Sequence, residues 1–449
     1  MTAFEKYDDG LVSERLTEGS SGKPLRICLL GYRSHPYCGG QGVYIHYLSK
    51  ALVAAGHKVD VISGEPYPVL DERVRLIKMP GLNLFEAESH IRALRWRHLR
   101  SWADFSEWWQ MATGGFGEPY SFGRRVVHYL RKHRDEYDIV HDNQSLCSGL
   151  LELQRMGVPV LATIHHPITR DRRIALEAAP TWGYRLLVRR WHSFLKMQKR
   201  VARRLHHITT VSRCSFEDIR RDFSVEPEQL RLIYNGIDTD VFRPLEGVTK
   251  VPGRIITTAS ADQPLKGLRY LLEAVAGLRA AHPRVSLRVI GKLNPDGPTQ
   301  KLLDELQLGD CASFVSGIST EQLVEEYNMA EVAVAPSLYE GFGLPAGEAM
   351  ACGVPIVSSD GGALPEVVGD AGMIVPAGKS AALRDALERL FDEPATRERL
   401  AAAGRERIDN SFCWRLAAQQ VVGYYREIIA VTQSGGVHAA NEPIAGGAQ

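Results

Sequence analysis

The sequence predicts an α/β protein built from two doubly wound domains, each with a parallel sheet covered by helices. Short apolar runs alternate with amphipathic helical patterns along most of the chain, as expected for parallel strands with helices on both faces. The alternation restarts once, after residues 235–244 (NGIDTDVFRP), and the length of 449 residues exceeds what one hydrophobic core usually serves. Because ligands of such sheets bind at the carboxyl ends of the strands, two facing sheets would form a central cleft.

The first domain is expected over residues 24–245. Its first strand, LRICLL at residues 25–30, precedes a glycine-rich turn and a helical pattern over residues 44–55, which Gly56 ends. Apolar runs typical of buried strands follow at residues 57–63, 138–141, 159–163 and 207–211.

The second domain is expected over residues 246–412. Apolar runs typical of strands occur at residues 254–259, 286–290, 312–315, 332–335 and 355–358. Helical patterns, such as those at residues 267–281 and 321–330, separate these runs. Both ends of the chain, residues 1–23 and 432–449, are polar or rich in Gly, Ala and Ser, so we expect disordered tails.

The composition is that of an ordinary globular protein, with 44% hydrophobic and 24% charged residues. A net charge of +1 gives no general reason to expect nucleic acid as a partner. The N-terminal residues contain no apolar segment typical of a secretory signal, and no apolar run approaches the length of a membrane span. The seven cysteines are scattered without a CxxC pair, so we expect a reducing cytoplasm and neither disulfides nor a zinc site.

A glycine-rich turn at residues 35–43 (HPYCGGQGV) follows the first strand. At Gly39 and Gly40 the backbone can approach an anion, which the free amides and the dipole of the next helix would favour. The alternative is a tight turn without a ligand. A nicotinamide-binding turn is disfavoured because the spacing is GGxG rather than GxGxxG.

A second glycine-rich segment spans residues 336–355 (PSLYEGFGLPAGEAMACGVP) and follows a buried strand pattern. Pro345 suits the first turn of a helix, which places Glu340 in the loop and Glu348 in the opening turns. Carboxylates accept hydrogen bonds from vicinal hydroxyls, and backbone amides at a helix start bind phosphates. The predicted amide donors are those of Gly341, Phe342, Gly343 and Leu344.

Lys266 lies in Leu265-Lys266-Gly267, at the expected start of a helix. A lysine there opposes the helix dipole, whereas beside a diphosphate it supplies a counter-charge. The alternative is a solvated surface lysine.

These segments resemble the family-4 retaining glycosyltransferases of the GT-B architecture, in which two Rossmann-like domains face a central cleft. The densest match is PSLYEGFGLPAGEAMACGVPIVSSDGGALPEVV, which begins at Pro336. Shorter matches are CGGQGVYIHYLSKAL, TIHH at residues 163–166, NGIDTDVF at residues 235–242 and PLKG at residues 264–267. The likeness runs from about residue 25 to about residue 431.

The resemblance implies a transferase that moves a sugar from a nucleoside-diphosphate sugar to an acceptor, with retention and without a metal or other cofactor. It implies that Glu348 binds the donor ribose, and that Glu340 and the amides after it hold the sugar and the phosphates. Lys266 would neutralise the leaving diphosphate, Gly40 would approach that diphosphate, and His165, rather than His166, would lie near the reacting sugar. It also implies that a last helix, residues 413–431, crosses back to the first domain.

Two features bear on this expectation. The family usually has an arginine six positions before the lysine, where this chain has Ser260. A diphosphate would lose one charge-assisted partner, typically worth about 1.5–3 kcal/mol. Asp238-Thr239-Asp240 matches the metal-binding Asp-x-Asp of other glycosyltransferases, but within NGIDTDVF we interpret it as structural.

A basic amphipathic segment spans residues 183–207, with eight Lys or Arg residues and no Asp or Glu. Its apolar residues recur at helical spacing: Tyr184, Leu187, Val188, Trp191, Phe194, Leu195, Val201 and Leu205. One interpretation is a surface helix with its apolar face on the core. The others are attachment to an anionic membrane surface or binding of an anionic acceptor. Nucleic acid is not expected, because no recognised motif accompanies the charge.

The acceptor is left open, with a lipid or lipid-linked glycan favoured over others. The reason is an aromatic-rich insertion in the first domain: Trp96, Trp102, Trp108, Trp109 and Phe116. We therefore expect a cytoplasmic protein that can lie at the inner membrane face.

Three other functions compete with glycosyl transfer. A sugar-nucleotide epimerase or hydrolase of the same architecture would use the same cleft without an acceptor. A catalytically weak scaffold subunit that binds sugar nucleotides is compatible with Ser260. A nicotinamide dehydrogenase would bind NAD, which the turn spacing disfavours.

Overall fold

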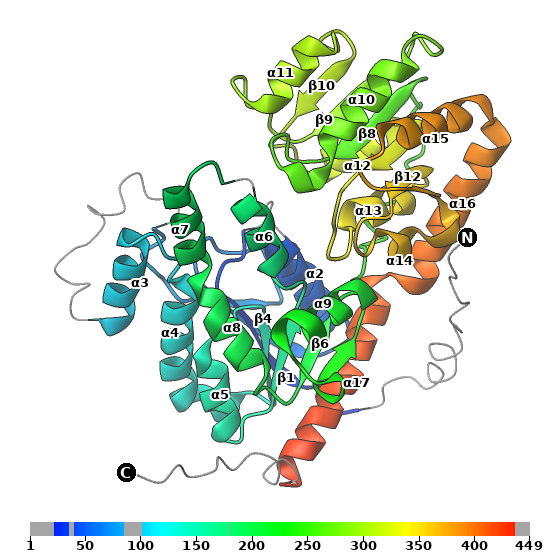
Figure 1. Cartoon of the computed structure of the whole chain (residues 1–449). Helices are drawn as coiled ribbons and strands as arrows, with labels where there is room; N and C mark the ends of the chain where they lie inside the picture. The colour runs from blue at the N-terminus through cyan, green and yellow to red at the C-terminus, as the bar shows by residue number, and fades with distance from the viewer. Residues whose placement is uncertain (1–21, 36–39, 85–100, 178, 436–449) are drawn as a thin grey trace.

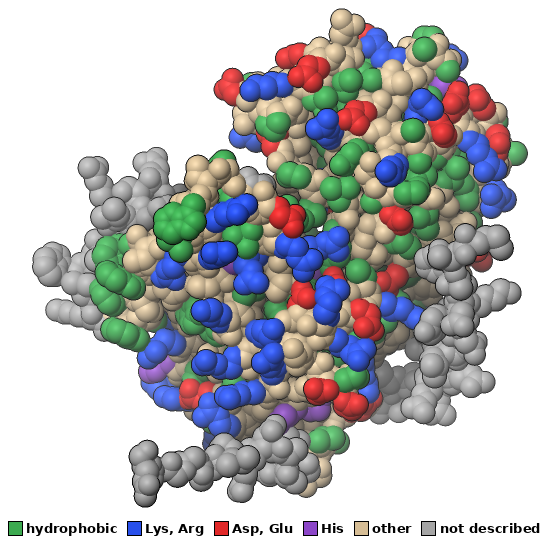
Figure 2. Space-filling view, viewed as in Figure 1, with side chains coloured by type: hydrophobic (Ala, Val, Ile, Leu, Met, Phe, Trp, Pro, Cys, Tyr) green, Lys and Arg blue, Asp and Glu red, His purple; other side chains and the backbone are tan. Residues whose placement is uncertain are grey.

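The computed structural model describes residues 22–35, 40–84, 101–177 and 179–435. Two parallel sheets lie in separate halves of the molecule, each covered by helices (Figure 1). The predicted fold class, two doubly wound α/β domains, is therefore confirmed. Figure 2 shows a recess between the two halves.

The N-terminal domain contains a seven-stranded sheet in the order β3-β2-β1-β4-β5-β6-β7. Its strands are β1 Arg26–Gly31, β2 Lys58–Ser63, β3 Arg75–Lys78, β4 Ile139–Asn143, β5 Val160–Ile164, β6 Ile208–Thr210 and β7 Leu230–Leu232. Its helices are α2 Gly40–Ala54, α3 Trp102–Ala112, α4 Glu118–His133, α5 Ser148–Arg155, α6 Thr169–Glu177, α7 Trp182–Trp191, α8 Leu195–Ala202 and α9 Arg213–Phe223. Short 3₁₀ helices are η2 Arg134–Glu136, η3 His192–Phe194 and η4 Pro227–Gln229. β1 and β4 are buried throughout or nearly so, as expected for central parallel strands.

The C-terminal domain contains a six-stranded sheet in the order β10-β9-β8-β11-β12-β13. Its strands are β8 Arg254–Thr258, β9 Ser286–Ile290, β10 Ala312–Val315, β11 Val332–Ala335, β12 Ile356–Ser359 and β13 Met373–Val375. Its helices are α10 Leu268–Leu278, α11 Pro298–Glu305, α12 Thr320–Met329, α13 Leu344–Ala351, α14 Leu364–Val368, α15 Ser380–Asp392 and α16 Pro394–Ser411. The short helices are η5 Pro264–Lys266 and η6 Gly369–Ala371.

The last helix, α17 Trp414–Gln433, leaves the C-terminal domain and lies along the N-terminal domain (Figure 1). It packs against α2 and β5, and its Trp414 ring stacks 6.0 Å from the ring of Tyr47 on α2. Farther along, the Tyr425 hydroxyl lies 2.6 Å from Nδ1 of the buried His141 on β4. Helices α2 and α17 therefore cover one face of the N-terminal sheet together.

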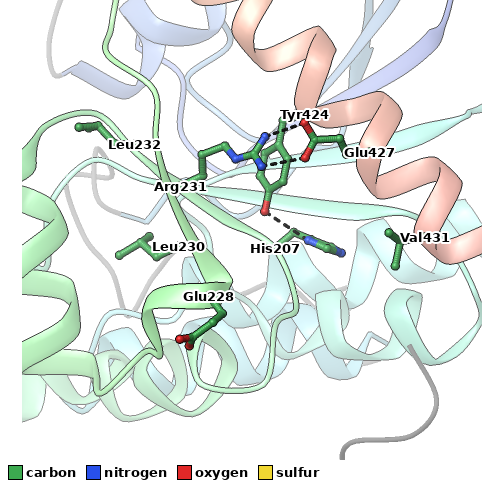
Figure 3. Close-up of a pocket in the computed structure, with 8 residues that line it drawn as sticks. All are labelled: His207, Glu228, Leu230, Arg231, Leu232, Tyr424, Glu427 and Val431. Atoms are coloured by element: carbon green, nitrogen blue, oxygen red, sulfur yellow. Dashed lines mark hydrogen bonds and ion pairs between the residues drawn. The ribbon is translucent and has the colours of Figure 1, made fainter. Parts of the chain in front are cut away.

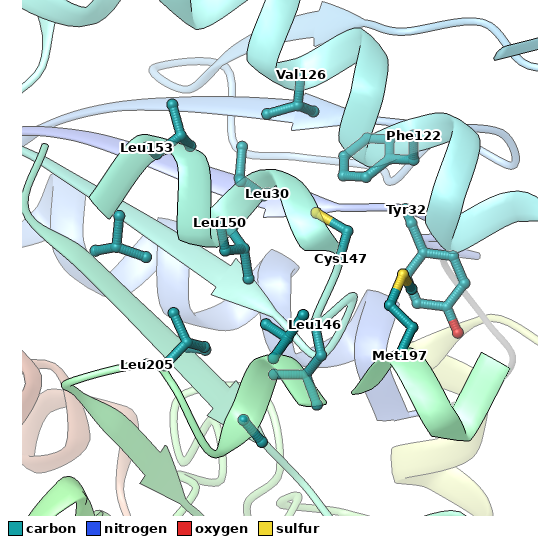
Figure 4. Packing of buried hydrophobic residues seen from close by; sticks show 14 of the residues in the cluster. Leu30, Tyr32, Phe122, Val126, Leu146, Cys147, Leu150, Leu153, Met197 and Leu205 are labelled. Carbon is teal, nitrogen blue, oxygen red and sulfur yellow. The ribbon is translucent and has the colours of Figure 1, made fainter. Parts of the chain in front are cut away.

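The opposite face of that sheet is covered by α4, α5 and α8 (Figure 4). Leu30 of β1 lies among Val126 of α4 and Leu150 and Leu153 of α5, all of them almost completely buried. Aliphatic burial on this scale is typically worth about 1.5–3 kcal/mol per side chain. The packing holds the carboxyl ends of the strands, where the candidate site residues lie, in fixed positions.

Three strands at the edges of the sheets were not predicted from the sequence: β3, β7 and β13. They are three or four residues long and only partly buried, so they lack the apolar runs of the central strands. Helix α2 begins at Gly40, four residues before the predicted start. Helix α17 continues to Gln433, past the predicted start of the C-terminal tail at residue 432, and residues 1–21 and 436–449 lie outside the described residues.

Candidate active site

The loop between β11 and α13, together with α13 itself, carries most of the predicted site residues. Gly343 has φ of 99° and forms the N-cap of α13, and Pro345 lies in the first turn, as predicted. Phe342 is buried in the core against Phe412, so only its backbone faces the loop. Among the described residues, the amides of the predicted donors at 341–344 have no hydrogen-bond acceptor. Free amides at a helix start form a ready anion-binding site.

Glu340 and Lys266 are brought together. Lys266 Nζ lies 2.8 Å from Glu340 Oε1, which also accepts a hydrogen bond of 2.7 Å from Ser337 Oγ. The lysine loop is docked onto the glutamate loop, since the Leu338 amide donates to the Leu265 carbonyl at 2.8 Å. Gly267 makes this approach possible: its φ is +64°, and a Cβ there would lie 2.0 Å from the Pro336 carbonyl oxygen.

Two adjacent glycines after β12 lie directly against the backbone of the Glu340 loop. A Cβ at Gly362 would lie 2.3 Å from the Glu340 carbonyl oxygen, and one at Gly361 would lie 2.3 Å from the Ser337 carbonyl oxygen. The Ala363 amide donates to the same Glu340 carbonyl at 2.9 Å. These glycines stand in the motif SDGGALPE, and their adjacency was the available signal for a close backbone approach.

Glu348 lies on α13, where its carboxyl group accepts a hydrogen bond of 3.2 Å from the Tyr327 hydroxyl of α12. Burial raises the pKa of Glu348 to about 7, although the Tyr327 hydrogen bond favours the carboxylate. The residue as a whole is half-buried rather than enclosed.

His165 directly follows β5, at the carboxyl end of the N-terminal sheet. Its Nε2 lies 2.7 Å from Asn143 Oδ1, and the Asn143 amide nitrogen donates to the Gln41 carbonyl at 2.9 Å. That amide orientation assigns the proton to Nε2 of His165. Burial, with smaller contributions from His166 and His141, lowers the pKa of His165 to about 3, so the ring is a neutral hydrogen-bonding group.

Sequence reasoning missed the residues that orient His165. The His165 amide donates to Gln144 Oε1 at 2.7 Å, and the Tyr44 ring meets the imidazole edge to face at 4.7 Å. Gln144 adopts φ of 56°, a conformation that non-glycine residues seldom occupy. No sequence pattern identifies such a residue in advance.

The two halves of the site meet at Gly341. A Cβ on Gly341 would lie 3.2 Å from the His165 carbonyl oxygen and 3.3 Å from His166 Nδ1. The Ser212 and Ser215 hydroxyls donate to the Gly341 carbonyl at 2.7 and 3.3 Å. The carboxylate loop of one domain and the histidine loop of the other therefore line one site.

Four further predicted positions are placed as follows. Gly40 is the first residue of α2, and Gly39 lies outside the described residues. Ser260 is exposed just beyond the end of β8, beside the loop that follows Gly291. Asp238 accepts a hydrogen bond of 2.6 Å from Lys50 and bonds to the backbone of its own turn, which agrees with a structural role.

Two cavities lie away from the candidate site residues described above. One of about 470 Å³ lies between β7 and α17, where Arg231 pairs with Glu427 and His207 Nδ1 lies 3.2 Å from the Tyr424 hydroxyl (Figure 3). The other, of about 510 Å³, lies beyond β9 and includes Lys292 and Phe314. The first of them is remote from the strand ends that carry the predicted residues.

The basic segment at residues 183–207 does not pack its whole apolar face on the core, as one interpretation of the sequence expected. Helix α8 buries its apolar face, but on α7 only Val188 is buried. The exposed large apolar residues of α7 and neighbouring α3, each 49–78% accessible, are Trp102, Trp109, Trp182, Tyr184, Leu186 and Leu187. Figure 2 shows Lys and Arg side chains gathered over the N-terminal domain, beside hydrophobic side chains. Trp108 and Phe116 pack in the core, and Trp96 lies outside the described residues.

None of the helices in the described part of the chain combines the length and apolar character needed to cross a bilayer.

Comparison with known proteins gives matches to both domains. Residues 38–241 match the family described as Glycosyltransferase Family 4, and residues 247–407 match that described as Glycosyl transferases group 1. The chain is 48% identical over 411 residues to the MMP α-(1→4)-mannosyltransferase of Mycolicibacterium hassiacum, covering 90% of this chain and 99% of that protein. It is 30% identical to the D-inositol 3-phosphate glycosyltransferase of Saccharomonospora viridis, covering 66% of this chain and 71% of that protein.

Solved structures show the same architecture. Sucrose-phosphate synthase from Thermosynechococcus elongatus superposes with a TM-score of 0.67 at 25% identity, covering 90% of this chain and 100% of that one. An Anabaena protein, HepE, in complex with UDP-glucose superposes with a TM-score of 0.65 at 16% identity, covering 90% and 100%. This second likeness concerns the fold alone.

Proposed function

Because the chain belongs to glycosyltransferase family 4 and is a glycosyltransferase of the GT-B fold, we propose that it transfers mannose from a nucleoside-diphosphate mannose to a glycan acceptor. The observation that carries the donor assignment is the free-amide loop at 341–344 beside the Lys266–Glu340 pair. Amides and an ammonium group suit a diphosphate, while carboxylates suit sugar hydroxyls. The choice of mannose follows the name of the relative at 48% identity.

In the proposed reaction the acceptor hydroxyl attacks the anomeric carbon from the side of the leaving group, so the configuration is retained. The bond from that carbon to the diphosphate oxygen breaks, and the departing oxygen takes the hydroxyl proton. Lys266 and the loop amides stabilise the charge on the nucleoside diphosphate, which a metal ion would otherwise do. Glu348 binds the ribose hydroxyls, and Glu340 and the neutral His165 orient the sugar.

The donor is tested by thermal unfolding in the presence of GDP-mannose, UDP-glucose, ADP-glucose or NAD, each with and without EDTA. We expect GDP-mannose, the mannose donor in this panel, to raise the melting temperature by several degrees. A ligand at about 100 times its Kd adds about 2.7 kcal/mol to the free energy of unfolding. EDTA should leave that shift unchanged. A shift with NAD alone would contradict the glycosyltransferase assignment, a larger shift with UDP-glucose would overturn the choice of mannose, and loss of the shift in EDTA would refute metal independence.

Release of free mannose as the main product, even with an α-1,4-linked mannose disaccharide present, would favour a hydrolase instead. Binding of GDP-mannose without turnover would favour the scaffold alternative, for which Ser260 supplies a reason. Transfer to the disaccharide is the expected result.

We further propose that α7 and α3 attach the enzyme to an anionic membrane surface, as a lipid-linked glycan acceptor would require. Exposed tryptophans beside arginines are typical of interfacial helices. Arg185 and Arg189 are exposed on α7 next to Trp182, Tyr184 and Leu186.

Cosedimentation with phosphatidylglycerol vesicles tests this attachment. Changing Arg185 and Arg189 together to glutamine should weaken binding about thirtyfold, from about 1 kcal/mol for each charge. Trp182→Ser should also weaken it, whereas Val69→Ser, at an exposed apolar residue on another surface, is the matched control. Unchanged binding in the arginine variant, or equal binding to neutral phosphatidylcholine vesicles, would refute the attachment.

A further inference from the structure

The residues on both sides of Glu340 are held by the other domain. Tyr339 donates a hydrogen bond of 2.7 Å from its hydroxyl to Asp218 Oδ2. On the other side, the Gly341 carbonyl accepts hydrogen bonds from the hydroxyls of Ser212 and Ser215. Glu340 itself belongs to the C-terminal domain, so its backbone is fixed by the N-terminal domain at two adjoining points.

The three N-terminal side chains belong to one structural element. Ser212 is the N-cap of α9, and Ser215 and Asp218 follow at intervals of three, on one face of that helix. The adjoining face of the helix is anchored in the N-terminal core through Ile219 and Phe223, which are almost completely buried. Helix α9 therefore presents a preformed polar face to the Glu340 loop.

Tyr339 is inserted into the N-terminal domain rather than resting on it. Its side chain is almost wholly buried, the Arg170 guanidinium lies 4.2 Å from the centre of its ring, and the His166 ring approaches edge-on. Asp218 is also buried and pairs with Arg221 at 2.5 Å. A buried hydrogen bond of this kind fixes geometry, because neither partner can exchange it for water.

The start of α9 contacts the C-terminal domain a second time. Glu366 of α14 accepts hydrogen bonds from the amides of Arg213 at 2.7 Å and Cys214 at 2.8 Å. This places a carboxylate at the positive end of the α9 dipole. The Ser215 hydroxyl also donates to the His165 carbonyl at 2.7 Å, so the same helix contacts the histidine loop.

We propose that α9 positions Glu340 for catalysis: Asp218, Ser212 and Ser215 set the backbone on both sides of this residue, so that its side chain reaches the reacting sugar only when the two domains are closed. This rests on the proposed function, in which Glu340 orients the donor sugar. The three α9 residues are positioning residues, since they contact the loop and not the substrate. Nucleotide binding by Glu348 and by the amides of Gly343 and Leu344, at the start of α13, does not depend on them.

The test is a set of variants assayed with GDP-mannose by release of GDP, together with GDP affinity by calorimetry. Asp218→Ala and Tyr339→Phe should each lower kcat by about tenfold to a hundredfold, as displacement of a reacting group by about 1 Å does. GDP affinity should stay within about twofold, because no partner of the nucleotide is removed. Asp218→Asn keeps an oxygen that can accept from Tyr339 and should restore most of kcat.

The double variant Asp218→Ala/Tyr339→Phe should lose no more than either single variant, because both remove one interaction. Glu217→Gln, at the residue that precedes Asp218 on α9 and whose side chain is 65% exposed, is the matched control and should behave as wild type. The proposal is overturned if kcat is unchanged in the single variants, if the losses add in the double variant, or if GDP affinity falls in parallel. A wild-type protein that neither binds GDP nor acts on GDP-mannose would instead refute the proposed function.

Discussion

Replacement of Lys266 by alanine is expected to lower kcat for mannose transfer by about a hundredfold to a thousandfold, the loss typical of removing one group that stabilises developing charge. Lys266 Nζ lies 2.8 Å from Glu340 and beside the free amides at the start of α13. Those amides offer partial charges, whereas the ammonium group offers a full one. The effect should be large in this chain because Ser260 stands where a second cation would help.

The measurement is steady-state kinetics with GDP-mannose. Lys266→Arg keeps the charge but not its compact geometry, and should fall between wild type and Lys266→Ala. Lys58→Ala is the control, since this exposed lysine begins β2 at the opposite end of the N-terminal sheet. A Lys266→Ala variant that retains more than about a third of wild-type kcat would exclude Lys266 from charge stabilisation.

Replacement of Glu348 by glutamine should weaken GDP binding about tenfold to a hundredfold at pH 8, from about 1.5–3 kcal/mol for hydrogen bonds to a charged group. Because the pKa of Glu348 is raised to about 7, the carboxyl group is protonated below that pH and is a poorer acceptor of ribose hydroxyls. Wild-type affinity should therefore rise between pH 6 and pH 8, and the variant should lose this dependence. The same raised pKa makes this group's contribution to folding stability largest below its ordinary value of 4.5, falling as the pH rises towards 7.

Calorimetric titration with GDP at pH 6, 7 and 8 measures both effects. Glu398→Gln, at an exposed glutamate of α16, is the matched control. If the wild type and Glu348→Gln show the same pH profile, another group governs nucleotide binding. If Glu348→Gln binds GDP as tightly as the wild type does at pH 8, the assignment of Glu348 to the ribose is wrong.

The sequence was most informative where one local rule determines the structure. Apolar runs of four or five residues located β9, β10 and β11 to the residue, and Pro345 placed the start of α13. Short edge strands such as β3 carry no such run, because partial burial tolerates polar residues.

The candidate site likewise contains residues that the sequence could identify and residues that it could not. Glu340, Lys266 and the amides at 341–344 are close in sequence to glycines that mark a ligand loop, so their proximity could be predicted. Asp218 and Gln144 could not, because their roles depend on a partner far along the chain and leave no periodic pattern. The exposed face of α7 was also unpredictable, since helical spacing shows that a face exists and not what covers it.

The position of α17 has a consequence for how the chain is made. The N-terminal sheet is complete once β7 has been synthesised, but Leu161 of β5, with Tyr44 and Leu48 of α2 beside it, is buried together with α17 residues 414–428. The part of the sheet face which α17 covers stays exposed to solvent until the ribosome has added almost two hundred further residues. The N-terminal domain therefore completes its core only when the C-terminal helix has been made. A fragment that stops after β7 would leave apolar residues on one side of the sheet exposed.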